Sequence, residues 1–436
     1  MKFNNKQYKK LINLLKYLKD NNIYWNQKLK NYSDDIINID NIDEIYKKID
    51  VINKSDILDD FDIYLDKKVL DCFDGDGKRM KEYLLNTNDL NKNHDKKIVG
   101  GKTNFMVETT SGTTGKPFPI VKNTSERIIA ANYLLKCRRK HYSEATINNA
   151  FLLAHEVDEY LKSTDYLNEK SDMKEVVDYF IEKKPKWVFV TANTIKRFTR
   201  AIKKFNKESE IGDVGVEFIE VTGAKLEDTE RREIEDIFKA PIRNQYGCRE
   251  VWNIAYECKC KKLHINDSNL LVDLVDENGN MIYNENEVGE VVITSLYNKT
   301  TPFIKYYLGD YASISYQKCE CGNTSPILNL HGGRKTEKLI NTPYFGTAVF
   351  RRVLRVLYFN KGIRYEKIKI IQDDQYHLSI YLYKCSDFDL FKEKFIEISS
   401  VMIENFDNFK VDFHLEYPFP NENRFLKEVI FISKII

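Results

Sequence analysis

The beginning of the chain places leucines on one side of a predicted helix. Leu11, Leu14, Leu15 and Leu18 recur at intervals of three and four residues, so they fall on the same helical face. The pattern predicts a helical N-terminal region within residues 1–100.

From about residue 105 to residue 330, short apolar runs alternate with segments of helical periodicity. The runs at 187–190 and 216–221 predict buried strands, and the segments at 194–207 and 227–238 predict helices. Strands that alternate with helices are typical of an α/β domain.

The next part of the chain favours strands. Apolar runs at 270–276 and 289–295 predict two strands, and Asn278-Gly279-Asn280 between them fits a hairpin turn. We therefore predict a β-rich section that follows the α/β pattern.

The residues after about 335 form a shorter series of elements. A helix, two strands, a second helix and a third strand are predicted at 349–358, 368–371, 377–383, 388–405 and 411–415. Gly332, Gly333 and Arg334 are the predicted linker. The predicted fold class is therefore α/β: a large domain of several subdomains with a β-rich section over residues 1–333, and a small mobile α+β domain over residues 334–436.

Composition narrows the classes of partner. The 436 residues carry 68 Lys and Arg against 66 Asp and Glu, so the net charge of +2 gives no field that would favour nucleic acid. The N-terminus lacks the apolar core of a signal peptide, and no run approaches the roughly 18 apolar residues of a membrane span. We expect a soluble, cytoplasmic protein without membrane or nucleic-acid partners.

The string T-T-S-G-T-T-G-K-P over residues 109–117 is the strongest chemical signal. Glycines let backbone N–H groups approach an anion, and the hydroxyls and the lysine add donors for phosphate oxygens. A Walker A loop is excluded because only Thr113 and Thr114 separate Gly112 from Gly115. The alternative is a surface loop rich in Ser, Thr and Gly.

The same string resembles the phosphate-loop signature of adenylate-forming enzymes, S-G-S/T-T-G-x-P. Further segments follow in that family's order: N-Q-Y-G-C-R-E at 244–250, T-S-L at 294–296, P-F-I-K-Y-Y-L-G-D at 302–310 and G-R at 333–334. These motifs, together with Y-W at 24–25 and V-I-N-K-S-D-I at 51–57, resemble those of the phenylacetate–CoA ligase-like branch, which contains CapK-type proteins. The resemblance covers nearly the whole chain to about residue 340.

The resemblance implies a role for each matching residue. The loop residues Ser111, Gly112, Thr113, Thr114 and Gly115 would bind phosphate, with Lys116 as a catalytic cation. Gly223 and Ala224 occupy the place of the adenine-binding turn, Tyr246 and Gly247 flank the adenine, Glu250 helps hold magnesium, Asp310 accepts the ribose hydroxyls, and Arg334 reaches the nucleotide.

The chain also departs from the family pattern. Arg249 replaces a small hydroxyl residue, and Thr336 stands where the hinge aspartate is expected. Arg424 takes the place of the catalytic lysine near the carboxyl terminus, and it keeps the charge with a broader, forked head. Adenylation would then use Arg424, be slowed, or be lost.

Four of the eight cysteines lie in two close pairs, which in a long cytosolic chain favours metal over disulfides. Cys258, His264, Cys319 and Cys321 would make a tetrahedral Cys₃His zinc site in the section 258–321, and some members of the branch carry such a site. Cys260 is the alternative first ligand, and reduced surface cysteines are the alternative to a metal. Four protein ligands leave no open position, so the predicted role of zinc is structural.

The leading hypothesis is an AMP-forming carboxylate–thiol ligase that uses ATP and Mg²⁺. Its expected partners are a small carboxylic acid, which the resemblance alone suggests to be aromatic, and either CoA or a phosphopantetheinyl carrier protein. The competing hypotheses are an impaired nucleotide- or acyl-binding accessory protein and an acyl transferase that needs no ATP. A homodimer is left open.

Overall fold

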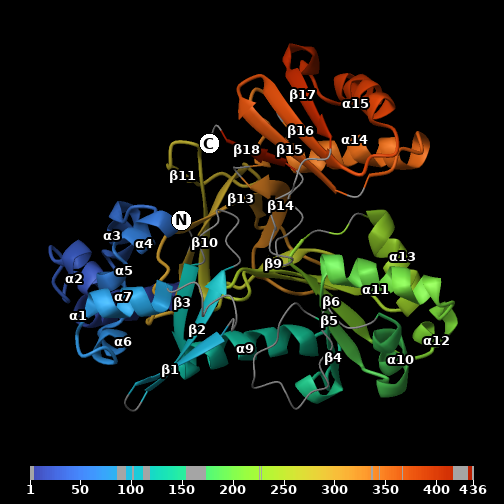
Figure 1. Ribbon diagram of the computed structural model, residues 1–436. Coiled ribbons are helices and arrows are strands. Elements are labelled where there is room, and N and C mark those ends of the chain that lie inside the picture. Colours follow the sequence, from blue (N-terminus) through green and yellow to red (C-terminus); the bar gives the residue numbers. More distant parts are fainter. Residues whose placement is uncertain are drawn as a thin grey trace. The chain divides into compact units, whose positions relative to one another are not determined.

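The computed structural model describes residues 4–85, 95–100, 103–110, 118–153, 173–224, 226, 228–334, 337–342, 344–365, 367–415 and 431–434 (Figure 1). The chain divides into two compact units. The first comprises Met1–Glu287, Val292–Leu308 and Ile314–Asn329; the second comprises Val288–Val291, Gly309–Ser313 and Leu330–Ile436.

The N-terminal region consists of short helices. They are α1 (Asn5–Asn21), α2 (Ile23–Leu29), α3 (Ile42–Lys48), α4 (Lys54–Asp59), α5 (Phe61–Tyr64), α6 (Lys67–Asp71) and α7 (Gly77–Leu85). The four leucines that predicted the first helix are all buried on α1. A capping box between Asn4 and Gln7 satisfies the first backbone donors of this helix.

An antiparallel sheet of three strands follows, with a long helix after it. Its strands are β1 (Asp95–Gly100), β2 (Thr103–Thr110) and β3 (Phe118–Asn123), and the helix is α9 (Thr124–Arg139). Strands β2 and β3 pair from Phe105 opposite Asn123 to Thr110 opposite Phe118. Thr110 and Phe118, the last described residue before the segment 111–117 and the first after it, therefore lie side by side.

The largest sheet has eleven strands in the order β11-β10-β12-β13-β14-β9-β8-β7-β6-β5-β4. Four strands run parallel: β4 (Ala150–Leu153), β5 (Trp187–Thr191), β6 (Phe218–Thr222) and β7 (Ile242–Tyr246). The others are β8 (Ala255–Glu257), β9 (Leu263–Ile265), β10 (Leu270–Val275), β11 (Met281–Ile282), β12 (Gly289–Ser295), β13 (Tyr306–Ser315) and β14 (Ile327–Arg334).

Helices pack beside the parallel strands (Figure 1). They are α10 (Met173–Lys183), α11 (Ala192–Lys204), α12 (Glu208–Gly212) and α13 (Asp228–Phe238), and a 3₁₀ turn, η1 (Ile147–Asn149), precedes β4. Phe180, Phe198 and Phe238 are fully buried between these elements and contact one another edge-on or at a tilt. The predicted α/β fold class is confirmed.

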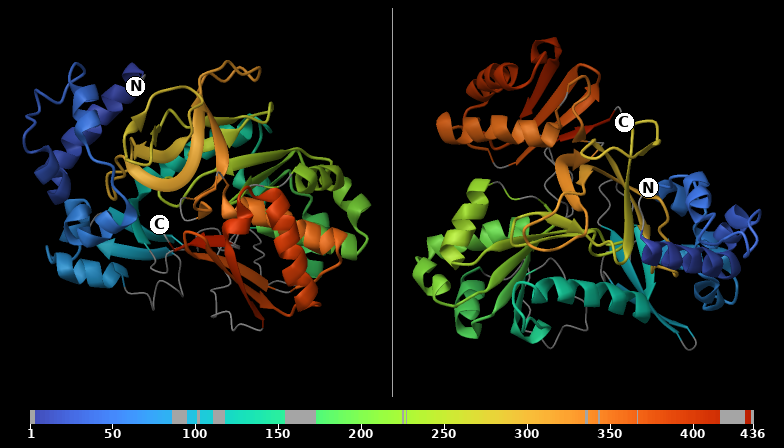
Figure 2. Two further views of the ribbon diagram at one scale, coloured as in Figure 1. Left: turned by 90° about the horizontal axis from the view of Figure 1, so that it is seen from above. Right: turned by 180° about the vertical axis from the view of Figure 1, so that it is seen from behind.

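The C-terminal part of the second unit is a four-stranded sheet in the order β17-β16-β15-β18 (Figure 2). Its elements are α14 (Gly346–Asn360), β15 (Lys367–Asp374), β16 (His377–Tyr383), α15 (Phe388–Met402), η4 (Phe406–Asn408), β17 (Lys410–Leu415) and β18 (Phe431–Ser433). Phe350, Phe395 and Phe431 join both helices to the sheet in one core.

The predicted linker was wrong, and several predicted element boundaries differ by a few residues from those of the structure. The predicted linker residues Gly332, Gly333 and Arg334 are the last residues of β14, because glycine accepts extended backbone as readily as a turn. The predicted helix 388–405 ends at Met402, shortly before Asn405 adopts a left-handed φ of +60°. The helix predicted at 194–207 is α11, which begins at Ala192 because Thr191 caps it. The predicted domains, 1–333 and 334–436, remain a prediction.

Candidate functional site

Two predicted nucleotide-binding segments meet at one edge of the parallel strands. In the register of β6 with β7, Thr222 lies opposite Gln245, and the Thr222 hydroxyl donates to the Gln245 carbonyl at 3.1 Å. Gly223 and Tyr246 therefore stand at neighbouring positions where these strands end. Parallel sheets bind ligands in the crevice outside the carboxyl ends of their strands.

The side chains at this edge suit a flat ligand. Gly223 has a left-handed φ of +89°, and Gly223 and Ala224 are both exposed. Tyr246 ends β7 and is half-buried. An exposed glycine turn beside a partly buried tyrosine ring can accept an aromatic base.

Gly247 begins a tight turn that only glycine allows. A Cβ atom at this position would lie 1.9 Å from the Trp252 carbonyl oxygen and 2.7 Å from Gln245 Nε2. The Gln245 amide donates to the same carbonyl at 2.5 Å, and the Ile254 N–H donates to the Tyr246 carbonyl at 2.8 Å. Trp252 closes the turn with a φ of +61°, a conformation that large side chains rarely adopt.

Glu250 lies inside this turn and is buried. The Tyr306 hydroxyl donates to its Oε1 at 3.1 Å, and the Asn298 side-chain amide donates to its carbonyl at 3.3 Å. A carboxylate offers about four acceptor positions, and the Tyr306 hydroxyl and the Cys248 thiol each hydrogen-bond to it, which leaves positions for a cation. The fixed carboxylate therefore fits a hard cation such as Mg²⁺, which binds one or two protein carboxylates together with substrate phosphates.

The remaining predicted residues lie outside the described residues or belong to the second unit. The predicted phosphate loop, Ser111, Gly112, Thr113, Thr114, Gly115 and Lys116, lies outside the described residues, and so does Arg424. Asp310 and Arg334 belong to the second unit, where Asp310 follows Gly309 on β13 and Arg334 ends β14. Their roles remain predictions.

Four metal-ligand residues converge between β8, β9 and the segment before β14. The ligand atoms of Cys258, His264, Cys319 and Cys321 all lie within 4.8 Å of one another. Cys258 Sγ is 3.8 Å from Cys319 Sγ, and Cys321 Sγ is 3.3 Å from His264 Nε2. These are the four residues that the sequence predicted.

The surroundings of this cluster fit a zinc ion. The His264 Nδ1–H donates to the Ser325 carbonyl at 2.8 Å, which leaves the Nε2 lone pair facing the three sulfurs. A backbone N–H bond from Cys321 lowers the pKa of the Cys319 thiol to about 6, which favours its thiolate, whereas burial raises the pKa values of the Cys258 and Cys321 thiols. Cys260 is not in the cluster, so the described geometry favours Cys258 as the first ligand.

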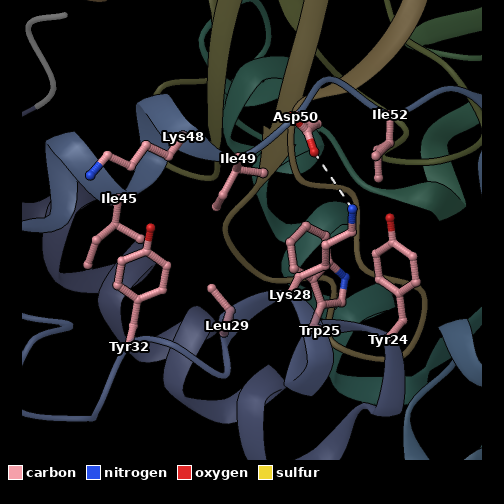
Figure 3. Close-up of a pocket in the computed structure, with 10 residues that line it drawn as sticks. All are labelled: Tyr24, Trp25, Lys28, Leu29, Tyr32, Ile45, Lys48, Ile49, Asp50 and Ile52. Carbon is pink, nitrogen blue, oxygen red and sulfur yellow. Dashed lines mark ion pairs between the residues drawn. The ribbon is translucent and has the colours of Figure 1, made fainter.

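A separate hollow lies in the N-terminal region (Figure 3). Its walls come from α2, α3 and the residues that follow each of these helices: Tyr24, Trp25, Lys28, Leu29, Tyr32, Ile45, Lys48, Ile49, Asp50 and Ile52. Lys28 and Asp50 form an exposed ion pair at 3.7 Å across it. None of the predicted site residues lines this hollow.

The sequence reasoning missed the residues that hold Glu250 in place. Asn298 and Tyr306 lie 48 and 56 positions from Glu250 along the chain. Asn298 lies two residues after T-S-L and Tyr306 lies within P-F-I-K-Y-Y-L-G-D, and in these two segments the resemblance implied a role for Asp310 alone. The tertiary fold buries both residues next to Glu250, and the spacing of motifs along the sequence does not reveal this contact.

Comparison with known proteins gives relatives in sequence. A phenylacetate-coenzyme A ligase of Thermus thermophilus is 27% identical over 114 residues, which are 25% of this chain and 26% of that protein. Protein CapK of Staphylococcus aureus is 24% identical over 246 residues, 52% of each chain. The chain thus spans about half of the second relative and a quarter of the first. No protein-family profile matches the chain.

Solved structures share the fold. A 2-hydroxyisobutyryl-CoA ligase in the postadenylation state with R3-HIB-AMP aligns with a TM-score of 0.67 and 11% identity, over 98% of this chain and 88% of that one. The same ligase with 2-HIB-AMP and CoA in the thioesterification state aligns with a TM-score of 0.59 and 13% identity, over 98% of this chain and 89% of that one.

Among the helices described here, none is both long and apolar enough to cross a bilayer.

Proposed function

We propose that the chain is a member of the adenylate-forming superfamily, similar to its phenylacetate–CoA ligase-like branch, and that it is an AMP-forming carboxylate–thiol ligase. One observation carries the proposal. The Gly223 turn and the Tyr246–Glu250 turn meet at the carboxyl edge of β6 and β7, where a parallel sheet binds its ligand.

The proposed nucleotide site combines residues of this edge with residues whose role comes from the resemblance. Gly223, Ala224, Tyr246 and Gly247 would hold the adenine. The ribose hydroxyls would donate to Asp310, and Arg334 would contact the nucleotide. The loop Ser111, Gly112, Thr113, Thr114 and Gly115 would bind the phosphates.

The proposed first step joins the acid to AMP. A carboxylate oxygen of the acid attacks the α-phosphorus of ATP, and pyrophosphate leaves with the electrons of the broken P–O bond. Lys116 and Arg424 would stabilise the charge that develops on the phosphate oxygens. Glu250 would hold Mg²⁺, which neutralises phosphate charge when it is bound.

The proposed second step moves the acyl group to sulfur. A thiolate attacks the acyl carbonyl carbon, the bond to the phosphate oxygen breaks, and AMP leaves. A solved ligase of this fold carries 2-HIB-AMP and CoA, which supports CoA as the thiol. A carrier-protein arm and an aromatic acid are the finer alternatives. Rotation of the domain 334–436 would separate the two steps.

We further propose that Cys258, His264, Cys319 and Cys321 hold one zinc ion with a structural role. A Cys₃His set fills all four tetrahedral positions and leaves none for substrate. The ion would join β8 and β9 to the segment before β14.

The proposal is tested by acid-dependent release of pyrophosphate from Mg·ATP across aryl, fatty and amino acids. Release with one acid, abolished by Asp310→Ala, is the expected result. ATP binding without release with any acid would favour an accessory binding protein. An absence of ATP binding by calorimetry would refute the ligase.

A further inference from the structure

A buried ion pair lies on the β2–β3 hairpin. Lys122 Nζ is 2.8 Å from Glu108 Oε2, and each side chain is only 3% exposed. Glu108 lies opposite Ile120 in the hairpin register, so Lys122 is its diagonal neighbour on the same face. Burial alone would raise the pKa of Glu108, but Lys122 and Trp252 hold this pKa below its usual range.

The pair also contacts the turn that carries Glu250. Lys122 Nζ donates to the Arg249 carbonyl at 2.5 Å, and the Trp252 indole N–H donates to Glu108 Oε2 at 2.9 Å. The Lys122 ammonium lies 5.0 Å from the centre of the Trp252 ring. The hairpin is therefore hydrogen-bonded to the turn on both sides of Glu250, at Arg249 and at Trp252.

Stability alone does not explain this arrangement. A buried ion pair is often no more stabilising than apolar residues of the same volume, because both charges lose water. The bond from Lys122 reaches the peptide group that joins Arg249 to Glu250. Asn298 holds the next carbonyl of the chain, that of Glu250, and Tyr306 holds the Glu250 side chain. With Lys122 removed, the peptide before Glu250 would lose its bond to the hairpin.

We propose that Lys122 and Glu108 are positioning residues for the Glu250 carboxylate as a ligand of the metal that accompanies the nucleotide. The inference rests on the proposed function of Glu250. Residues that orient a metal ligand typically change metal affinity by about 10- to 100-fold when they are mutated. The effect should therefore appear in the magnesium dependence of ATP binding.

The test measures the dissociation constant of ATP by calorimetry in EDTA and in excess Mg²⁺, without any acid. The dissociation constant in EDTA divided by that in Mg²⁺ is called the magnesium ratio, and it is large when bound Mg²⁺ strengthens ATP binding. Lys122→Met should lower this ratio about 10-fold or more and should have little further effect when it is combined with Glu250→Gln. The matched control is Arg138→Met, which breaks another ion pair of the first unit, between the partly buried Arg138 and the buried Glu220 at 2.7 Å. It should leave the ratio unchanged.

A double variant separates positioning from folding. Glu108→Gln with Lys122→Met removes both buried charges, so it should recover thermal stability relative to Lys122→Met alone. It still lacks the bond to the Arg249 carbonyl, so the magnesium ratio should stay low. Recovery of the ratio together with stability would overturn the positioning role, and so would an unchanged ratio in Lys122→Met. A wild-type protein that binds no ATP would overturn the proposed function as well, which distinguishes the two failures.

Discussion

Gly247→Ala is the substitution whose effect the structure defines most sharply. The added Cβ would lie 1.9 Å from the Trp252 carbonyl oxygen, whereas ordinary contact begins at 3.4 Å. One of the two chain segments must therefore move by about 1.5 Å, and a displacement of about 1 Å at a reacting site can cost about 100-fold in rate.

The cost in stability can be worked from the same contacts. Overpacking a well-packed site costs about 1–3 kcal/mol. Loss of the buried bond from Gln245 Nε2 to the Trp252 carbonyl adds about 1 kcal/mol. We expect Gly247→Ala to lower the free energy of unfolding by about 2–4 kcal/mol, measured by urea denaturation, and to weaken ATP binding in calorimetry.

Gly279→Ala is the matched control. Gly279 has a φ of +80° but nothing within 4 Å of the added Cβ, so the substitution meets backbone strain without a clash. It should cost about 1–2 kcal/mol and leave ATP affinity unchanged. If Gly247→Ala matches Gly279→Ala in both stability and ATP affinity, the close approach in the turn is not what requires glycine at 247.

Other consequences are testable with single variants. We expect one zinc ion per chain by elemental mass spectrometry, lost in His264→Ala and kept in Cys260→Ser; a zinc-free wild type would contradict the cluster. Burial raises the pKa of Asp273 from 3.8 to about 7, so the folded state keeps a proton that the unfolded state releases, and stability is lost as the pH rises through this range. The unfolding free energy of Asp273→Asn minus that of the wild type should therefore increase between pH 4 and pH 7. A difference that does not change with pH in urea titrations would refute this. Arg424→Lys should raise the rate of acyl-AMP formation about tenfold, a change of about 1.4 kcal/mol in the barrier, and no gain would mean that the arginine does not limit this step.

Elements with a strong local signal were predictable from the sequence. The apolar run at 187–190 lies within β5, and the charged helix at 227–238 corresponds to α13. The Asn278-Gly279-Asn280 turn does form a hairpin, but its second strand is the short β11 rather than the predicted strand 289–295. The Cys₃His set was predictable because thiols and imidazoles in close pairs have few other roles in a long chain.

The hydrogen bonds between the β2–β3 hairpin and the turn that carries Glu250 were not predictable in the same way. Glu108 and Trp252 are 144 positions apart, and only the pairing of the hairpin with the turn brings them together. A charged residue within an otherwise apolar strand, such as Lys122 after 118–121, is the signal that could have found it. A charged residue of this kind indicates a buried partner of opposite charge, but which residue that partner is depends on the tertiary fold.

The most direct test of the central proposal follows an oxygen atom. The acid is labelled with ¹⁸O in its carboxylate and incubated with Mg·ATP, CoA and the protein, and AMP is analysed by mass spectrometry. Attack of the carboxylate on the α-phosphorus, followed by thiol attack on the acyl carbon, predicts one ¹⁸O atom in each AMP. Thioester formed with unlabelled AMP, or with the label in inorganic phosphate, would contradict an acyl-adenylate intermediate.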